Sequence, residues 1–217
     1  LALVVLGDLR ESVGIAIGIL LIWGIVVGLI RPPKVTPLQV FWVALLIRCL
    51  VMLSPASLSD DLFRYLWEGR AIRLGGNPYL HAPMLDVWPE DWIRSRVNHA
   101  EITSVYPPLT LWVFAALGAL WHHPLVIKVT MGCIDALLAG TIASVLKGRG
   151  RDVSMAWIYA LHPLAVVESA GSGHMEPMAL LAMVLAIRSW DRGSSGVFWA
   201  GIGGLLKLFP AVLIATV

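Results

Sequence analysis

Two adjacent carboxylates, Asp60 and Asp61, begin a charged stretch, DDLFRYLWEGR, that lies between segments apolar enough to cross a bilayer. Ionisable residues at a membrane are costly and commonly functional. If both face one cavity, their like charges would make one of them the better proton acceptor, as a general base for a hydroxyl requires, or together they could bind a cation. The alternative is structural, because acidic residues also complement the positive end of a helix, and Asp60 could pair with Arg64.

A second polar cluster lies in the turn Gly171-Ser-Gly-His-Met-Glu-Pro177. Glycines allow the backbone to approach a ligand closely. We expect His174, with Glu176 beside it, to form a wall opposite Asp60 and to bind a phosphate or an acceptor hydroxyl. The alternative is a glycine-rich turn whose polar residues face water.

Several charged residues lie inside apolar segments, where such groups usually pair or line a pathway. They are Arg48, Lys128, Asp135, Glu168 and Lys207. Lys207 precedes Leu208-Phe209-Pro210, and His162-Pro163 precedes Glu168. Each proline predicts a helix kink, because it lacks the N–H that a helix interior requires. A separate polar run could bind a sugar or a phosphate, or could be a solvated loop: Arg94, Arg96, Asn98, His99 and Glu101.

Familiar nucleotide and hydrolase motifs are absent from the sequence. It has no Walker motif, no Gly-x-Gly-x-x-Gly and no nucleophile elbow, so nucleotide hydrolysis has no support. His122-His123 has no carboxylate or cysteine at metal-ligand spacing, and we therefore propose no zinc site.

The composition is that of an integral membrane protein. The chain is 58% hydrophobic and 14% charged, whereas soluble domains carry about a quarter charged residues. A net charge of +2 gives no case for a nucleic-acid partner. Cys49 and Cys133 fall inside apolar segments and are expected to be buried thiols. Because both chain ends lie in apolar runs, we expect residues 1–217 to be one transmembrane domain within a longer polytopic protein.

Spanning helices need about 20 apolar residues. The candidates are Val13–Ile30, Leu38–Leu53, Leu125–Leu146, Val153–Ser169, Pro177–Ser189 and Val197–Val217. Basic turns at 31–34, at 147–151 and at Arg188 with Arg192 are expected in the cytoplasm by the positive-inside rule. The loop 54–106, with the two acids, and the turn 170–176 then lie outside. This pattern predicts an all-α, polytopic transmembrane bundle.

The charged stretch itself predicts a helix from Asp60 that ends before Gly75-Gly76. Leu62, Phe63, Leu66 and Trp67 fall on one face, and Asp60, Arg64 and Glu68 on another. We expect an amphipathic helix lying along the outer membrane face.

One apolar segment, Leu109–Trp121, does not fit the alternation of spans. A full crossing there would place the basic turn at 147–151 outside. We therefore expect a re-entrant or surface-lying helix, entered through Tyr106-Pro107-Pro108 and ended by His122-His123-Pro124. Non-spanning backbone at membrane depth is tolerated only beside protein or a water-filled cavity.

Five motifs, in this order, carry a family resemblance. They are DDLFRYLWEGRAIRLGGNPYL, RVNHAEITSVYPPL, LHPLAVVES, GSGHMEP and LKLFP. Together they resemble the bacterial polyprenyl-phosphate-sugar-dependent glycosyltransferases of the GT-C superfamily. More distantly, they are similar to the mannosyltransferase that adds the first mannose of GPI anchors. The resemblance covers most of the chain, from Ser59 to Pro210.

The resemblance implies a GT-C-like fold and a reaction on the extracytoplasmic side of the cell membrane. The donor would be a polyprenyl-phosphate-linked sugar and the acceptor a glycan or glycolipid, with inversion at the anomeric carbon. Asp60 or Asp61 would deprotonate the acceptor hydroxyl. Substrate would contact six further residues: Arg64, Glu68, Tyr106, His174, Glu176 and Lys207. Of these, Arg64, His174 and Lys207 would stabilise the departing phosphate.

Other points stay open in the resemblance. Mannose is indicated by the better-known relatives, with glucose, galactose and arabinose as alternatives. Some members use a divalent metal and others do not, so a metal cofactor stays open and no ligand is assigned. The acids are adjacent here but spaced by one residue in the GPI enzyme, and at least two spans precede them. A transporter or flippase is the alternative function; it predicts related halves, and the sequence has no visible repeat.

Overall fold

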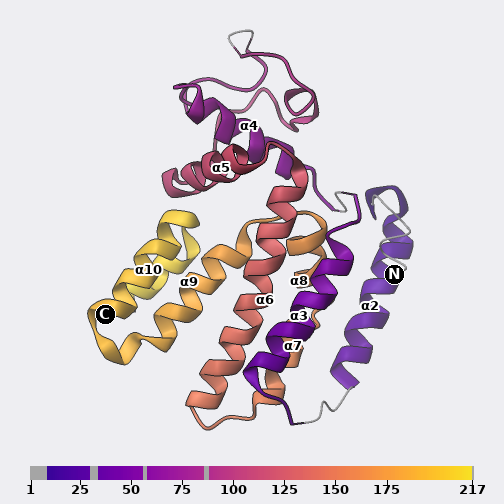
Figure 1. Cartoon of the computed structure of the whole chain (residues 1–217), viewed down its shortest axis with the longest axis vertical. Coiled ribbons are helices and arrows are strands. Elements are labelled where there is room, and N and C mark those ends of the chain that lie inside the picture. Colours follow the sequence, from indigo (N-terminus) through magenta and orange to yellow (C-terminus); the bar gives the residue numbers. More distant parts are fainter. Residues whose placement is uncertain (1–8, 30–33, 56–57, 86–87, 217) are drawn as a thin grey trace.

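The computed structural model describes residues 9–29, 34–55, 58–85 and 88–216, and every regular element in these ranges is helical. The elements form two parts (Figure 1). A bundle of longer helices runs along the long axis, and a cap of two helices with a long loop covers one end of it. The all-α prediction is confirmed for the described residues.

The bundle is built around one central helix, α6. It begins at a proline, a residue whose fixed φ and missing N–H suit the first turn of a helix. α3 packs along α6 through small residues, and a Cβ on Gly140 would come within 3.0 Å of the Cβ of Phe41. The bounds of the bundle helices are α2 (Val13–Leu29), α3 (Pro37–Val51), α6 (Pro124–Gly148), α9 (Glu176–Arg188) and α10 (Ser194–Leu206).

The predicted span 153–169 is broken near its middle. It consists of short pieces, η3 (Val153–Ala156), α7 (Trp157–Ala160), α8 (Pro163–Val166) and the π-helical turn η4 (Val167–Gly171). The two halves meet at 59°. The predicted kink at His162-Pro163 is therefore confirmed.

The predicted span 197–217 is wrong as a single helix. α10 ends at Leu206, Lys207 is extended (φ −153°, ψ 142°), and the 3-10 segment η6 (Phe209–Thr216) packs back on α10. A Cβ on Gly203 would lie 2.7 Å from Pro210, which shows how close the two segments come. At Pro210 the chain therefore does not continue as a kinked helix; the helix has already ended and the chain reverses direction.

Two of the charges inside apolar segments pair, as predicted. Arg48 and Asp135 are fully buried, with Arg48 Nε donating to Asp135 Oδ2 at 2.7 Å. Ser169 Oγ donates to the same oxygen at 2.9 Å, and the hydroxyl of Tyr159 donates to Oδ1. Arg48 also donates to the carbonyl of Ala160 at 2.8 Å. This network joins α3, α6 and the broken segment.

The cap is made of α4 (Asp61–Arg73), α5 (Pro108–Leu120) and the loop between them, which includes the short 3-10 turn η2 (Arg94–Arg96). α4 and α5 cross at very close range, because a Cβ on Gly69 would lie 2.4 Å from the backbone of Phe114. α4 ends at Arg73, before Gly75 (φ +78°), as its sequence predicts.

The expected amphipathic surface helix is wrong for α4. Its apolar face is buried at Leu62, Leu66 and Trp67, but Arg64 and Glu68 on the polar face are also buried. The physical reason is that the loop 98–104 covers the polar face and bonds to it. α5 lies across the end of α6 (Figure 1), so this segment does not run along the axis of the bundle. Whether it is re-entrant or surface-lying stays a prediction.

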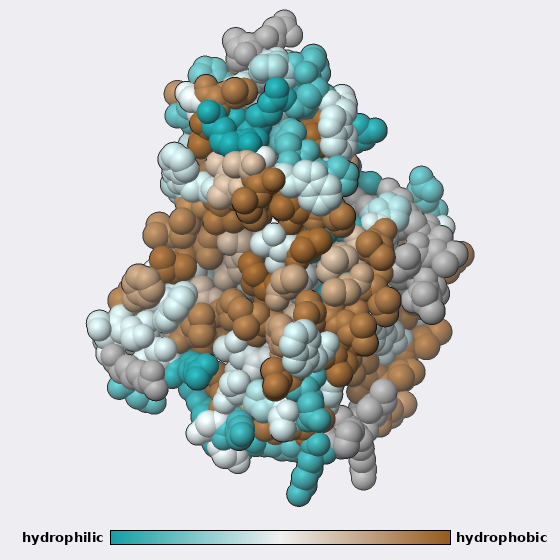
Figure 2. Space-filling view, in the orientation of Figure 1, coloured by the Kyte–Doolittle hydropathy of each residue, from teal (hydrophilic) through white to brown (hydrophobic). Residues whose placement is uncertain are grey.

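The surface is divided by polarity. In Figure 2, hydrophobic residues cover the middle of the bundle, and hydrophilic residues gather on the cap and at the opposite end. Within the described residues, two helices are long and apolar enough to cross a membrane, Leu9–Leu29 and Pro124–Gly148. The number rises to three if the bent pair Val153–Ala160 and Pro163–Gly171 forms one span.

Cys49 and Cys133 are exposed, not buried as expected, because they lie on outward surfaces of α3 and α6.

Two of the basic turns, 147–151 and the one that begins at Arg188, lie together at the end of the bundle opposite the cap. Arg149 Nη2 donates to the carbonyl of Ile187 at 3.2 Å, which brings the ends of α6 and α9 together. A small cavity there is lined by residues of both ends, among them Arg149, Arg188 and Asp191. Arg31 and the side chain of Arg192 lie outside the described part of the chain.

Candidate active site

The two acids lie where the chain enters α4. Asp60 is the residue before the helix and Asp61 its first residue. The amide of Asn98 bridges them, with Nδ2 donating to Asp60 Oδ1 at 2.9 Å and to Asp61 Oδ1 at 2.5 Å. Arg10 Nη1 lies 3.0 Å from Asp60 Oδ2. Asp60 therefore pairs with Arg10, whereas Arg64 bonds elsewhere.

His174 lies opposite Asp61, in the turn between η4 and α9. Its Nε2 is 3.7 Å from Asp61 Oδ2, and its Nδ1 is 2.5 Å from Glu168 Oε2. Gly173 has φ +75°, a conformation that favours glycine, and so allows the sharp turn that brings His174 to this position. The structure thus brings together the two polar clusters that the sequence singled out.

The charges around His174 favour its protonated form. Burial opposes the imidazolium, but the carboxylate of Glu168 in contact with it, with the charges of Glu176 and Asp61, raises the pKa of His174 above its ordinary value. The carboxylates around His174 therefore stabilise its imidazolium form. Such a cation suits an anionic ligand or a neighbouring base.

Glu176 and Lys207 form a second ion pair beside this one. Glu176 is the first residue of α9, and the Lys207 ammonium donates to its Oε1. Lys207 reaches it because the chain leaves α10 in an extended conformation. Glu176 Oε2 and His174 Nε2 are buried and have no hydrogen-bond partner among the described residues. Such orphaned polar atoms in a polar cluster are candidates for contacts with substrate.

Tyr106 completes the cluster on the cap side. Its ring packs edge-on against Tyr65 and Phe114, with centroids 5.3 and 5.5 Å apart. Burial, followed by the charges of Asp61 and Glu68, raises the pKa of the Tyr106 phenol. The hydroxyl therefore stays protonated and can donate a hydrogen bond.

Arg64 and Glu68 lie inside the cap. Arg64 Nε donates to Glu68 Oε1 at 3.0 Å, and Ser104 Oγ donates to Glu68 Oε2 at 2.9 Å. The guanidinium of Arg64 also donates to four loop carbonyls: Asn98, His99, Ile102 and Thr103. These bonds hold the loop that carries Asn98 to the acids. A direct contact of Arg64 or Glu68 with substrate stays a prediction.

Three residues of the cluster were missing from the predicted set, and one of them, Arg10, had not been singled out at all. Glu168 was singled out only as a charge in an apolar segment, and Asn98 only as part of a polar run. Glu168 reaches His174 because η4 is a π-helical turn, and no residue pattern in the sequence indicates such a turn. Asn98 reaches the acids because Arg64 holds the loop that carries it. The carbonyls that Arg64 binds lie 34 to 39 positions further along the chain, so the sequence does not reveal these contacts.

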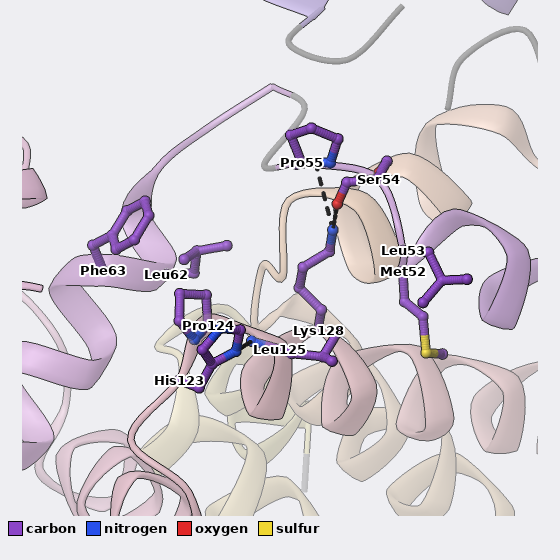
Figure 3. Close-up of a pocket in the computed structure, with 10 residues that line it drawn as sticks. All are labelled: Met52, Leu53, Ser54, Pro55, Leu62, Phe63, His123, Pro124, Leu125 and Lys128. Carbon is purple, nitrogen blue, oxygen red and sulfur yellow. Dashed lines mark hydrogen bonds between the residues drawn. The ribbon is translucent and has the colours of Figure 1, made fainter. Parts of the chain in front are cut away.

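An apolar cavity of about 400 Å³ lies beside Leu62, the residue that follows Asp61 in α4 (Figure 3). It is lined by residues from the end of α3 and the starts of α4 and α6, among them Met52, Leu62, Phe63 and Leu125. Lys128 donates to the carbonyl of Ser54 at its edge. Leu62 also contacts the turn that bears His174, since a Cβ on Gly173 would lie 3.6 Å from its Cβ.

Metal binding has no built site in the described residues. Among them, no group of three or more histidine, cysteine, aspartate or glutamate side chains could hold a metal ion. We therefore assign no residue to a metal.

An apolar helical bundle with a cluster of acids and bases at one end is the layout of a membrane-embedded enzyme. A family model, the MptA_B family, described as alpha-(1->6)-mannopyranosyltransferase, N-terminal domain, matches residues 7–217. The chain belongs to this family, and it is accordingly a glycosyltransferase of the mannosyltransferase kind, as the resemblance predicted. No curated protein and no solved structure matches the chain.

Proposed function

We propose that this protein transfers a mannosyl group from a polyprenyl-phosphate donor to a hydroxyl group of a glycan or glycolipid, with inversion at the anomeric carbon. The observation that carries the proposal is the meeting of Asp61 and His174 at the junction of the cap and the apolar bundle. Family membership supplies the sugar and the type of reaction. A lipid-linked donor can reach this junction from the bilayer, and the apolar cavity beside Leu62 offers space for its first isoprenoid units.

Asp61 is the better candidate for the base. Asp60 already pairs with Arg10, whereas Oδ2 of Asp61 faces His174 and the interior of the cluster. Asp61 would take the proton of the acceptor hydroxyl as its oxygen attacks C1 of the mannosyl group. The bond from C1 to the phosphate oxygen breaks at the same time, and the polyprenyl phosphate leaves with the bonding electrons.

The leaving phosphate gains negative charge, which nearby cations stabilise. His174 and Lys207 are the candidates at the rim of the cluster, and both belong to the predicted set. Lys207 is about one third exposed, so its pairing with Glu176 leaves it accessible to a ligand.

The active site would lie on the extracytoplasmic side of the membrane. The basic ends of α6 and α9 lie at the opposite end of the bundle from the acids, and lysine and arginine favour the cytoplasmic side. The transporter alternative is not favoured, because the matching family is one of transferases.

The test uses the complete protein, expressed in a host that lacks related enzymes. Membranes are given radiolabelled polyprenyl-phosphate mannose and an oligomannoside acceptor. We expect Asp61→Asn to lower the transfer rate by about 10²- to 10⁴-fold, the usual contribution of a general base. Asp60→Asn should retain most of the rate, and Asp191→Asn, an exposed carboxylate at the opposite end, should not change it. Equal transfer by wild type and Asp61→Asn would exclude Asp61 as the base.

A further inference from the structure

One residue outside the predicted site, Glu168, holds His174 at two points. Its backbone carbonyl accepts from the N–H of His174 at 2.9 Å, and its carboxylate lies 2.5 Å from Nδ1 of the same residue. Glu168 belongs to the π-helical turn η4, which is closed by the N–H of Ser172 donating to the carbonyl of Val167 at 2.8 Å. π-helical turns inside helices are frequent at functional sites.

The ionised groups of the cluster can be sorted into pairs. Asp60 pairs with Arg10, and Glu176 pairs with Lys207. The two remaining carboxylates, Glu168 and Asp61, face opposite nitrogens of the same imidazole. The aliphatic part of the Lys128 side chain lies close to Gly173, but its ammonium donates to the carbonyl of Ser54.

We propose that Glu168 is a positioning residue of the transfer reaction, which holds His174 so that one imidazolium is shared between Glu168 and Asp61. This inference rests on the proposed function, in which Asp61 is the base. Through its two contacts Glu168 keeps the imidazole between its own carboxylate and that of Asp61. In the proposed reaction the same imidazolium stabilises the leaving phosphate, so its position relative to the base matters. Glu168 thus keeps a cation beside the base without touching substrate.

The pH dependence of transfer follows from this arrangement. The groups facing His174 are Asp61 from α4, Glu168 from η4 and Glu176 from α9, the last paired with Lys207. In the proposed reaction transfer requires the imidazolium of His174, so the rate falls on the alkaline side when His174 loses its proton. Removing the charge of Glu168 lowers the pKa of His174, and the alkaline limb of the profile moves to lower pH.

The experiment measures mannosyl transfer by the complete protein as a function of pH. For Glu168→Gln we expect the alkaline limb to move down by at least about one pH unit, the usual effect of a charge within 4–6 Å. Glu168→Asp keeps the charge and should restore part of the wild-type profile. Glu101→Gln is the matched control, because Glu101 Oε1 lies 3.8 Å from Nδ1 of His99 and both side chains are largely exposed. A Glu168→Gln profile that superimposes on that of wild type overturns the proposal.

A second measurement does not depend on turnover. Nuclear magnetic resonance of ¹⁵N-histidine-labelled complete protein in detergent gives the titration of His174, assigned with His174→Gln. Glu168→Gln should lower its midpoint, and an unchanged midpoint overturns the shared imidazolium. Absence of mannosyl transfer in the wild type would count against the proposed function, whereas this midpoint still decides the contact between Glu168 and His174.

Discussion

At the scale of the residue, side-chain type indicated which charged groups matter, but it did not indicate what each of them contacts. Arg64 and Glu68 share the helix that carries the acids, and their charges made them candidates for substrate contact. The structure buries both, and the bonds of Arg64 reach the loop 98–104. Arg64 is therefore the link between α4 and the position of Asn98.

The pair in the cap predicts a loss of stability when one partner is removed. Arg64→Met leaves the carboxylate of Glu68 buried without its cation, and breaking such a pair typically costs about 3–5 kcal/mol. Thermal unfolding in detergent, together with proteolysis within 98–104, measures the effect. Arg96→Met, an exposed arginine of the same loop, is the control. Equal melting temperatures for the two variants would contradict this role of Arg64.

Glu68 predicts a pH dependence of stability. Burial raises its pKa from 4.5 to about 7, although Arg64 and Ser104 lower it in part. In that interval the folded protein binds a proton that the unfolded chain has released, so the free energy of unfolding falls as pH rises from 4.5 to about 7. Glu68→Gln should remove this slope. Melting temperatures of both proteins over this interval check it, and parallel curves would show that Glu68 does not titrate there.

At the scale of the element, prolines and glycines were the most reliable signals. His162-Pro163 predicted the break between α7 and α8, and Gly75-Gly76 predicted the end of α4. What the sequence could not supply was the partner of each polar face. The loop 76–107 has no periodicity that would reveal that it covers α4, and a π-helical turn such as η4 has no composition of its own. The sequence predicted that His174 would face Asp60, whereas in the structure it faces Asp61. Arg10, Glu168 and Asn98 were found as neighbours of these residues only in the structure.

The crossing of α4 and α5 depends on one glycine. A Cβ on Gly69 would lie 2.4 Å from the carbonyl carbon and oxygen of Phe114, so Gly69→Ala must push the helices apart. Overpacking of this kind costs about 1–3 kcal/mol, and it should also move Asp61 and reduce transfer. Melting temperature and transfer rate are measured together. Gly148→Ala is the control, because no atom lies within 4 Å of its Cβ position, and a wild-type-like Gly69→Ala would refute the tight crossing.

The buried network of the bundle gives a prediction of its own. Asp135→Leu leaves the guanidinium of Arg48 buried without its carboxylate and should cost about 3–5 kcal/mol. Adding Arg48→Leu should recover much of this loss, because apolar residues can replace a buried ion pair. Unfolding in detergent compares the single and double variants. A double variant less stable than Asp135→Leu alone would contradict the prediction that removing both charges recovers stability.

At the scale of the whole molecule, hydrophilic residues gather on the cap and at the opposite end, and the middle is apolar. The end opposite the cap holds the basic ends of α6 and α9. The apolar middle is what composition predicted. The six crossings were only partly supported, because several bundle helices are shorter than a bilayer is thick and one predicted span turns back on itself. Helix length along the sequence could not reveal that reversal.

This division predicts which side of the membrane each end faces. Single cysteines at Glu101 in the cap and at Arg151 in the basic end are introduced after Cys49 and Cys133 have been replaced by alanine. In intact cells, an impermeant thiol reagent should label Glu101→Cys and should label Arg151→Cys only after the cells are opened. Labelling of Arg151→Cys from outside would invert the proposed topology.

The cluster is assembled from residues far apart in the chain, and this has a consequence for biosynthesis. Asp60 can meet Arg10 and Asn98 as soon as the first half of the protein has been made. Asp61 meets its imidazole only after the turn at His174 is complete, and Lys207 reaches Glu176 later still, when α10 has ended. The cap is therefore synthesised long before His174 and Lys207, the cationic residues of the cluster. If the cluster acts as proposed, the nascent protein stays inert until α9 and α10 have been made.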